Sequence, residues 1–196
     1  MLIGGLLTFG LGVALMIRAD LGLDPWSAFH IGLTNVFPIS YGVASVGAGI
    51  VLLTIGWRLL GQQIDWGTVL NMVLIGFFAD FFLLFVPEAA QFGYLFRWLW
   101  LLLAIVLIGL AIGLYIGSRW GAGPRDGFVL SLSKRTGRSV RLLRTMLELS
   151  VLVVGVLLGA TAGWGTIAFA LMIGPAMQLS LRVFRVLPTA APAGTD

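Results

Sequence analysis

Long apolar runs dominate the chain, and short polar segments separate them. Six such runs lie at about residues 2–19, 42–60, 67–86, 98–117, 142–161 and 165–183. Each is close to the roughly 20 apolar residues that an α-helix needs to cross a bilayer. Apolar and polar positions do not alternate within the runs, which indicates helices rather than the strands of a membrane barrel. The pattern therefore predicts an all-α polytopic membrane protein with six transmembrane helices.

One short stretch of the chain occurs twice. The sequence GLDPWSAF at residues 22–29 recurs as GAGPRDGF at residues 121–128, and 124 minus 25 for the shared proline sets an offset of 99. Glycine followed by proline predicts a tight turn that starts a helix, with Asp24 and Gly123 at the two N-cap positions. Further matches at offsets of 99 or 98 include Ser40 with Ser139 and the WGT motifs at 66–68 and 164–166. We interpret these matches as an internal duplication.

Each half contains a short helix after the repeated turn, at about residues 25–35 and 124–136. At ~1.5 Å per residue these helices are too short to cross the ~30 Å core, so we expect them to be broken or re-entrant. Three crossings per half then give two inverted three-helix repeats, at about residues 1–87 and 98–187, within a single transmembrane domain. The two turns are expected on opposite faces, at the two ends of any solute pathway. Residues 188–196 are expected to form a disordered tail.

Composition and charge agree with this topology. The chain is 59% hydrophobic and 10% charged, with a mean hydropathy of +1.05, which is unlike a soluble domain. Six crossings place all Lys and Arg residues except Arg18 and Arg97 on one side, and the positive-inside rule makes that side cytoplasmic, together with both termini. Topology therefore explains the pI of about 10.3, and no nucleic-acid partner is expected. An alternative with eight crossings would carry Lys134 and Arg135 into the membrane at high cost.

Four segments carry a resemblance to a known family. They are GLGVAL at 10–15, ADLGLDPW at 19–26, WGTVLN at 66–71 and GTIAFALMIGP at 165–175. Together they resemble the bacterial YczE/YyaS/YitT family of integral membrane proteins, and the YczE-like branch most, over nearly the whole chain to about Leu187. The resemblance implies a polytopic protein of the bacterial cytoplasmic (inner) membrane. It supplies no substrate and no mechanism.

Seven residues stand out because they place charge or hydrogen-bonding capacity at the repeated turns or inside a span. As candidate substrate-binding residues we name Asp24, Trp26, Asp80, Arg119, Arg125, Glu148 and Gln178. At the second turn, the helix N-terminus and its arginines could bind an anionic group, or the arginines could anchor the turn at lipid phosphates. Gln178 stands at the repeat position of Asp80 (178 minus 98), so we expect a binding surface that is symmetric in shape but not in charge.

Two of these candidates are carboxylates inside predicted spans, where ionisable groups are costly and are often functional. Asp80 lies near the outer end of its span, where an ion pair with Arg18 or Arg97 is the alternative interpretation. Glu148 follows Arg144 by four residues, which predicts an i,i+4 ion pair near the cytoplasmic end.

The residue types exclude several classes of chemistry. The chain has no cysteine and one histidine, so we expect no disulfide, metal site or cysteine nucleophile. It also shows no nucleotide-binding loop, nucleophile elbow or metal-ligand cluster, so we expect no cofactor and no enzyme activity. His30 is expected at the outer interface as a hydrogen-bonding surface residue. We predict secondary transport or export of a small organic solute through rocking of the two repeats. The alternative is a non-transporting accessory or regulatory membrane protein that acts through its basic cytoplasmic loop. The expected partners are the lipid bilayer and a small solute, and a homo-oligomer stays open.

Overall fold

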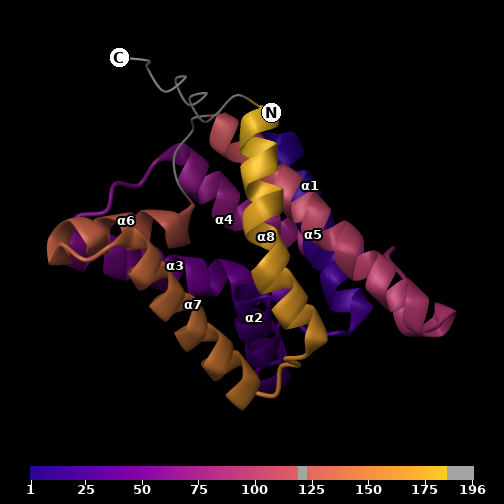
Figure 1. Cartoon of the computed structure of the whole chain (residues 1–196). Helices are drawn as coiled ribbons and strands as arrows, with labels where there is room; N and C mark the ends of the chain where they lie inside the picture. The colour runs from indigo at the N-terminus through magenta and orange to yellow at the C-terminus, as the bar shows by residue number, and fades with distance from the viewer. Residues whose placement is uncertain (119–122, 185–196) are drawn as a thin grey trace.

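The computed structural model describes residues 1–118 and 123–184, and this part of the chain is all helical (Figure 1). The helices are α1 (Leu2–Ala19), α2 (Pro25–Val36), α3 (Tyr41–Leu60), α4 (Trp66–Leu83), the 3-10 turn η1 (Ala89–Phe92), α5 (Tyr94–Gly117), α6 (Pro124–Thr136), α7 (Val140–Leu157) and α8 (Trp164–Val183). The two short helices predicted after the repeated turns are therefore confirmed as α2 and α6. Arg119 and the predicted tail at 188–196 lie outside the described residues.

Five of the described helices, α1, α3, α4, α5 and α8, are long and apolar enough to cross a membrane. The remaining predicted span coincides with α7, which has 18 residues but carries Arg141, Arg144 and Glu148 in its first half. Large apolar side chains are exposed on the outside of the molecule, including Trp66, Leu84 and Leu157. Exposed apolar surface of this extent is expected where a protein contacts lipid rather than water. The chain is a multi-pass helical membrane protein.

α1 and α5 lie side by side along one side of the fold (right in Figure 1). Their contact contains fully buried side chains, among them Leu6 and Met16 from α1 and Leu101 and Ile105 from α5. Small residues let the two backbones approach: a Cβ added at Gly12 would lie 2.7 Å from Ile108 Cγ1. α4 packs on α1, and α8 packs on α5.

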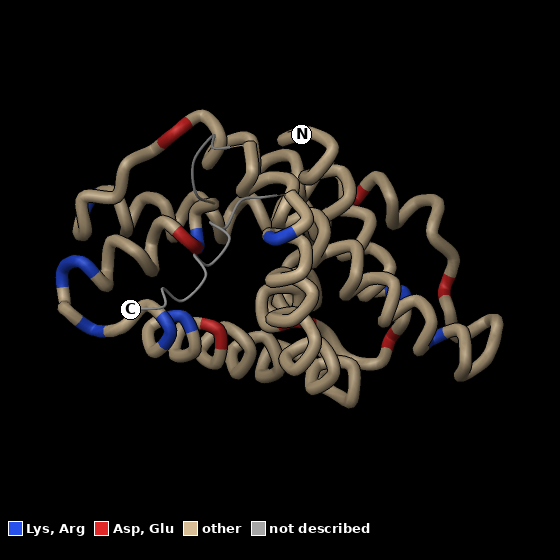
Figure 2. Tube along the Cα trace, turned by 45° about the horizontal axis from the view of Figure 1, so that its top comes forward, with Lys and Arg blue, Asp and Glu red and all other residues tan. Residues whose placement is uncertain are grey.

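Two further helix pairs, α2 with α7 and α3 with α6, complete the structure. α2 and α7 cross at the backbone level, because a Cβ added at Gly155 would lie 2.5 Å from the carbonyl carbon of Ala28. At the far end of the other pair, the Arg135 guanidinium donates to the carbonyl of Leu59. Lys and Arg residues gather on this side of the molecule, where α6 joins α7 (left in Figure 2).

The first test concerns a close helix crossing. A Cβ added at Gly10 would lie 2.5 Å from Phe78 Cβ and 2.9 Å from the backbone nitrogen of Ala79, so α4 would have to move away from α1. We expect Gly10→Ala to lower the free energy of unfolding by about 1–3 kcal/mol, seen as a lower melting temperature of the detergent-solubilised protein. Gly4→Ala is the matched control in the same helix, since a Cβ there meets no atom within 4 Å. Equal melting of both variants would contradict the packing described for α1 and α4.

Candidate functional site

The first repeated turn is built by backbone geometry and a carboxylate cap. Asp20 ends α1 in the left-handed conformation with φ 50, and Gly22 has φ +113, which a residue with a side chain rarely adopts. Asp24 then caps α2: its Oδ1 accepts hydrogen bonds from the backbone N–H groups of Trp26 (3.1 Å) and Ser27 (3.2 Å). The prediction that Asp24 is an N-cap is confirmed.

The second turn uses the same backbone plan without that carboxylate. Gly123 is the N-cap of α6 and Pro124 occupies its first position, as predicted, but no side chain caps the helix. Gln62, from the loop after α3, is buried beside this turn, and its Nε2 donates to the carbonyl of Pro124 at 3.3 Å. A Cβ added at Gly127 would lie 2.4 Å from the same nitrogen. Gln62 therefore positions the first turn of α6.

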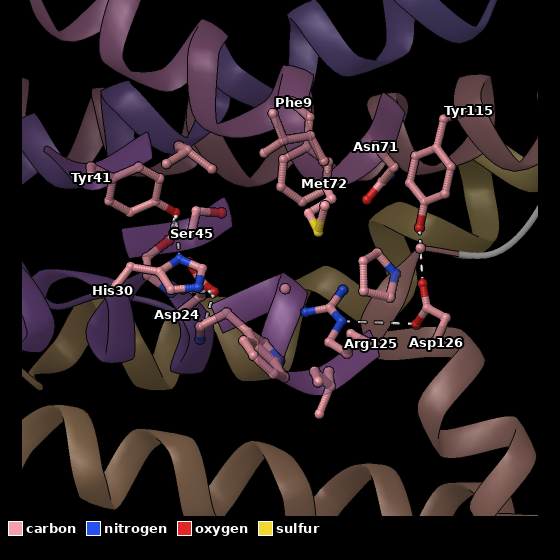
Figure 3. Close-up of a pocket in the computed structure, with 18 residues that line it drawn as sticks. Phe9, Asp24, His30, Tyr41, Ser45, Asn71, Met72, Tyr115, Arg125 and Asp126 are labelled. Atoms are coloured by element: carbon pink, nitrogen blue, oxygen red, sulfur yellow. Dashed lines mark hydrogen bonds and ion pairs between the residues drawn. The ribbon is translucent and has the colours of Figure 1, made fainter. Parts of the chain in front are cut away.

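The two turns meet in one cavity of about 110 Å³ (Figure 3). Figure 3 shows Asp24 and His30 on one side of this cavity, and Tyr115, Arg125 and Asp126 on the other. Both helix starts therefore line one cavity, whereas the sequence predicts the two turns at separate ends of a pathway. α1 and α5 pack antiparallel, so the two turns leave opposite ends of this pair, and the starts of α2 and α6 both reach the cavity.

Arg125 connects the two turns electrostatically. Its guanidinium carbon lies 5.8 Å from the centroid of the Trp26 ring, which is within the range of a cation–π interaction. Asp126 offers only a distant ion pair to Arg125, at 3.9 Å. Its carboxylate also accepts a hydrogen bond from the Tyr115 hydroxyl at 3.2 Å and lies 3.7 Å from Arg144. Positive and negative charge therefore face the same small cavity.

A neutral hydrogen-bonded cluster forms the wall on the side of α2. The Tyr41 hydroxyl shares hydrogen bonds with Ser27 Oγ at 3.1 Å and with His30 Nδ1 at 3.3 Å. His30 is only 7% exposed, so its expected place at the surface is wrong. Burial, with a smaller contribution from the charge of Arg125, lowers the pKa of His30 to about 3, and the imidazole is neutral at pH 7.

Asp24 is the buried acid of this site. It is 7% exposed, and its Oδ2 has no hydrogen-bond partner among the described residues. Burial raises the pKa of Asp24, whereas the hydrogen bonds from Ser27 and the charge of Arg125 act in the opposite direction. Within the described residues, no three His, Asp or Glu side chains come close enough together to share a metal ion.

Of the sequence candidates, Asp24, Trp26 and Arg125 lie together at the cavity, but Asp80 does not. The Asp80 carboxylate caps α3 from α4, where it accepts hydrogen bonds from Ser40 Oγ at 2.5 Å and from the Gly42 N–H at 2.9 Å. The ion pair considered between Asp80 and Arg18 or Arg97 is therefore not formed: Arg18 binds Glu88, and Arg97 binds Asp20.

The remaining candidates lie outside the cavity lining or outside the described residues. Glu148 pairs with Arg144 at 3.1 Å, which confirms the predicted i,i+4 contact. Gln178 is exposed on α8, and Arg119 falls outside the described residues.

Sequence reasoning missed several residues that line the cavity. Asn71 had the clearest signal, since it is the one amide in the apolar run of α4. Tyr41 and Tyr115 had weaker signals, because tyrosines near span ends are common for reasons unrelated to a site.

Comparison with known proteins agrees with the class that the fold defines, a multi-pass helical membrane protein. The sequence matches the family described as "Family of unknown function (DUF6198)" over residues 1–182, and the chain belongs to this family. No solved structure matches the chain.

Three relatives match the chain over most of its length. The chain is 36% identical over 184 residues to the uncharacterized membrane protein YczE of Bacillus subtilis (strain 168), which covers 90% of this chain and 82% of that protein. An uncharacterized protein of Haemophilus influenzae is 33% identical, covering 91% of this chain and 81% of its own length. The uncharacterized protein YyaS of Bacillus subtilis is 24% identical, covering 83% and 82% respectively. The YczE-like resemblance seen in the motifs is confirmed.

The second test separates a structural role of Asp80 from a role in binding. Asp80→Ala removes the acceptor of the Gly42 N–H and the Ser40 hydroxyl, so we expect it to lower the free energy of unfolding by about 1–3 kcal/mol. Thermal melting in detergent measures this loss. Gln178→Ala, at the exposed repeat position on α8, is the control and should melt like the wild type. A normal melting temperature for Asp80→Ala would show that the cap is not stabilising.

Proposed function

We propose that the protein is a secondary transporter or exporter of a small organic solute in the bacterial cytoplasmic membrane. The observation that carries the proposal is the convergence of both repeated turns on one cavity. Helices that break and begin inside a membrane protein, at corresponding points of two repeats, are the usual frame of a solute site in secondary transporters. In this proposal the two halves rock against each other around the cavity.

Repeat-equivalent contacts support two copies of one three-span unit. A Cβ at Gly10 would meet Phe78 Cβ, and a Cβ at Gly109 would meet Ala176 Cβ. These pairs are related by the offsets of the sequence repeat, since 109 minus 10 is 99 and 176 minus 78 is 98.

The ends of the short helices support the same relation. The Asn35 amide at the end of α2 donates to the carbonyl of Leu158, and Arg135 at the end of α6 donates to the carbonyl of Leu59. The two acceptors are again 99 residues apart. The two donors are 100 residues apart (135 minus 35), so both partners follow the repeat to within one residue.

In the proposed topology α7 is the fifth of six spans and both termini are cytoplasmic. The charged residues of α7, Arg141, Arg144 and Glu148, lie in its first half, where a helix that enters from the cytoplasm meets the basic side. The remaining part of α7, up to Leu157, is apolar.

The topology can be tested with single cysteines, because the natural chain contains none. Gln91, Thr136 and Ala162 are exposed and lie between helices or at a helix end. We expect a membrane-impermeant maleimide to label Gln91→Cys and Ala162→Cys in intact cells, but Thr136→Cys only after the membrane is permeabilised. Labelling of Thr136 and Ala162 from the same side would show that α7 does not cross, and would overturn the inverted arrangement.

Transport can be tested with purified protein in proteoliposomes. A thermal-shift screen against metabolites identifies a ligand, whose flux is then followed with radiolabel. We expect Arg125→Gln to lower the flux at least tenfold, because it removes the positive charge from the cavity. Arg138→Gln makes the same change on the exposed basic loop and should transport normally. A wild-type protein that binds ligand but shows no flux would favour the accessory or regulatory function instead.

A further inference from the structure

We infer that the solute held between the two turns is a small zwitterion, with a carboxylate at the start of α6 and an ammonium group at Asp24. This inference names the ligand class of the cavity and so rests on the proposed function. It follows from a difference between the two copies of the turn.

The carboxylate position is defined by the repeat itself. In the first copy, Asp24 places a carboxylate oxygen on the backbone N–H groups of Trp26 and Ser27. In the second copy Gly123 stands at the same place (123 minus 24 is 99), has no side chain, and leaves the start of α6 without a side-chain cap. That helix start lines the cavity together with the Arg125 side chain. A ligand carboxylate completes the second cap as Asp24 completes the first.

The ammonium position is defined by an unpartnered acceptor. Asp24 uses Oδ1 for its cap, whereas its Oδ2 is buried and has no hydrogen-bond partner among the described residues. The Trp26 Nε1 donor is also buried and has no hydrogen-bond partner among the described residues. A buried acceptor without a donor costs about 1–3 kcal/mol, so the carboxylate favours a ligand that brings N–H donors.

The charge of the cavity disfavours ligands with a single charge. The carboxylates of Asp24 and Asp126 would repel a purely anionic ligand, and the guanidinium of Arg125 above the Trp26 ring would repel a purely cationic one. A molecule that carries both groups meets an opposite charge at each end. The volume of about 110 Å³ suits a compact solute, since one water needs roughly 10–15 Å³ on the same measure.

The wild-type protein tests the ligand class without any mutation. Isothermal titration in detergent compares β-alanine, glycine and 4-aminobutyrate with propionate and propylamine, which carry only one of the two charges. We expect at least one zwitterion to bind at least tenfold more tightly than both single-charge compounds. Equal or tighter binding of propionate or propylamine, or no binding by any zwitterion, overturns the inference.

A tethered carboxylate tests the position at α6. Gly123 has φ −58 and ψ 163, which any residue adopts, but a Cβ there would lie 2.9 Å from Asn71 Oδ1. The double variant Gly123→Asp with Asn71→Ala makes room and supplies the cap. Compared with Gly123→Ala in the same Asn71→Ala background, we expect a higher melting temperature and at least a tenfold loss of zwitterion affinity. Unchanged affinity between the two would place the carboxylate elsewhere.

The ammonium position is tested by Asp24→Asn. Asparagine retains an oxygen that can cap α2, and replaces the free oxygen with an NH₂ donor. We expect at least a tenfold loss of zwitterion affinity with no loss of affinity for propionate, and equal loss for both would contradict the assignment. Flux measurements separate the two proposals. Zwitterion binding without flux would contradict the transport function but support the ligand class. Flux of another solute without zwitterion binding would support transport but contradict the ligand class.

Discussion

Two helices begin in the interior of this protein, and the rest of the structure depends on how their first backbone N–H groups are satisfied. The start of an α-helix leaves these donors without internal partners, and an apolar environment offers no water to replace them. α2 solves the problem within its own sequence, through Asp24. The cap residue of α6 is Gly123, which has no side chain, so other residues position the start of this helix. Gln62 donates a hydrogen bond to the carbonyl of Pro124, and the Arg125 guanidinium lies over the ring of Trp26.

α1 and α5 form an antiparallel pair: a Cβ added at Gly5 would lie 3.0 Å from Leu114 Cβ, and Arg97 near the start of α5 binds Asp20 at the end of α1. The two turns therefore leave this pair at opposite ends, and α2 and α6 both begin at the cavity. The halves share this frame but differ in chemistry. In the first half Tyr41 closes the wall with Ser27 and His30, whereas in the second half Tyr115 holds the Asp126 carboxylate. The two walls of the cavity therefore differ in charge.

A second difference between the halves lies at the outer helices. α3 and α4 pack together, and Asp80 joins them by capping α3. The equivalent helices α7 and α8 make no comparable contact among the described residues, and a cavity of about 520 Å³ lies beside them, lined by Arg144 and Met177 among others. Gln178 stands at the repeat position of Asp80, where a carboxylate would be needed to cap α7 from α8. The second half therefore lacks the interaction by which Asp80 links α4 to α3.

The sequence predicted what depends on neighbours along the chain. Asp24 caps α2 as its place before the proline predicts, and Arg144 meets Glu148 one turn away. It did not predict what depends on how helices cross. A crossing count predicts the two turns on opposite faces. It carries no information on how deeply a short helix enters the protein, so it did not predict that both helix starts line one cavity. The hydrogen bonds of Asp80 with α3, and the hydrogen bond from Gln62 to Pro124 at the start of α6, also depend on how the helices pack.

These contacts also decide which buried charges can indicate function. An ionisable residue in a membrane segment is a functional candidate because its burial needs a reason. Asp80 and Glu148 each have a sufficient structural reason, since one caps α3 and the other pairs with Arg144. In Asp24 only Oδ1 has a structural role, as the acceptor that caps α2. Its second oxygen is buried and has no hydrogen-bond partner among the described residues. Asp24 and Arg125 line the same cavity, and a cap alone does not use that oxygen, so the proposed ligand site rests on it.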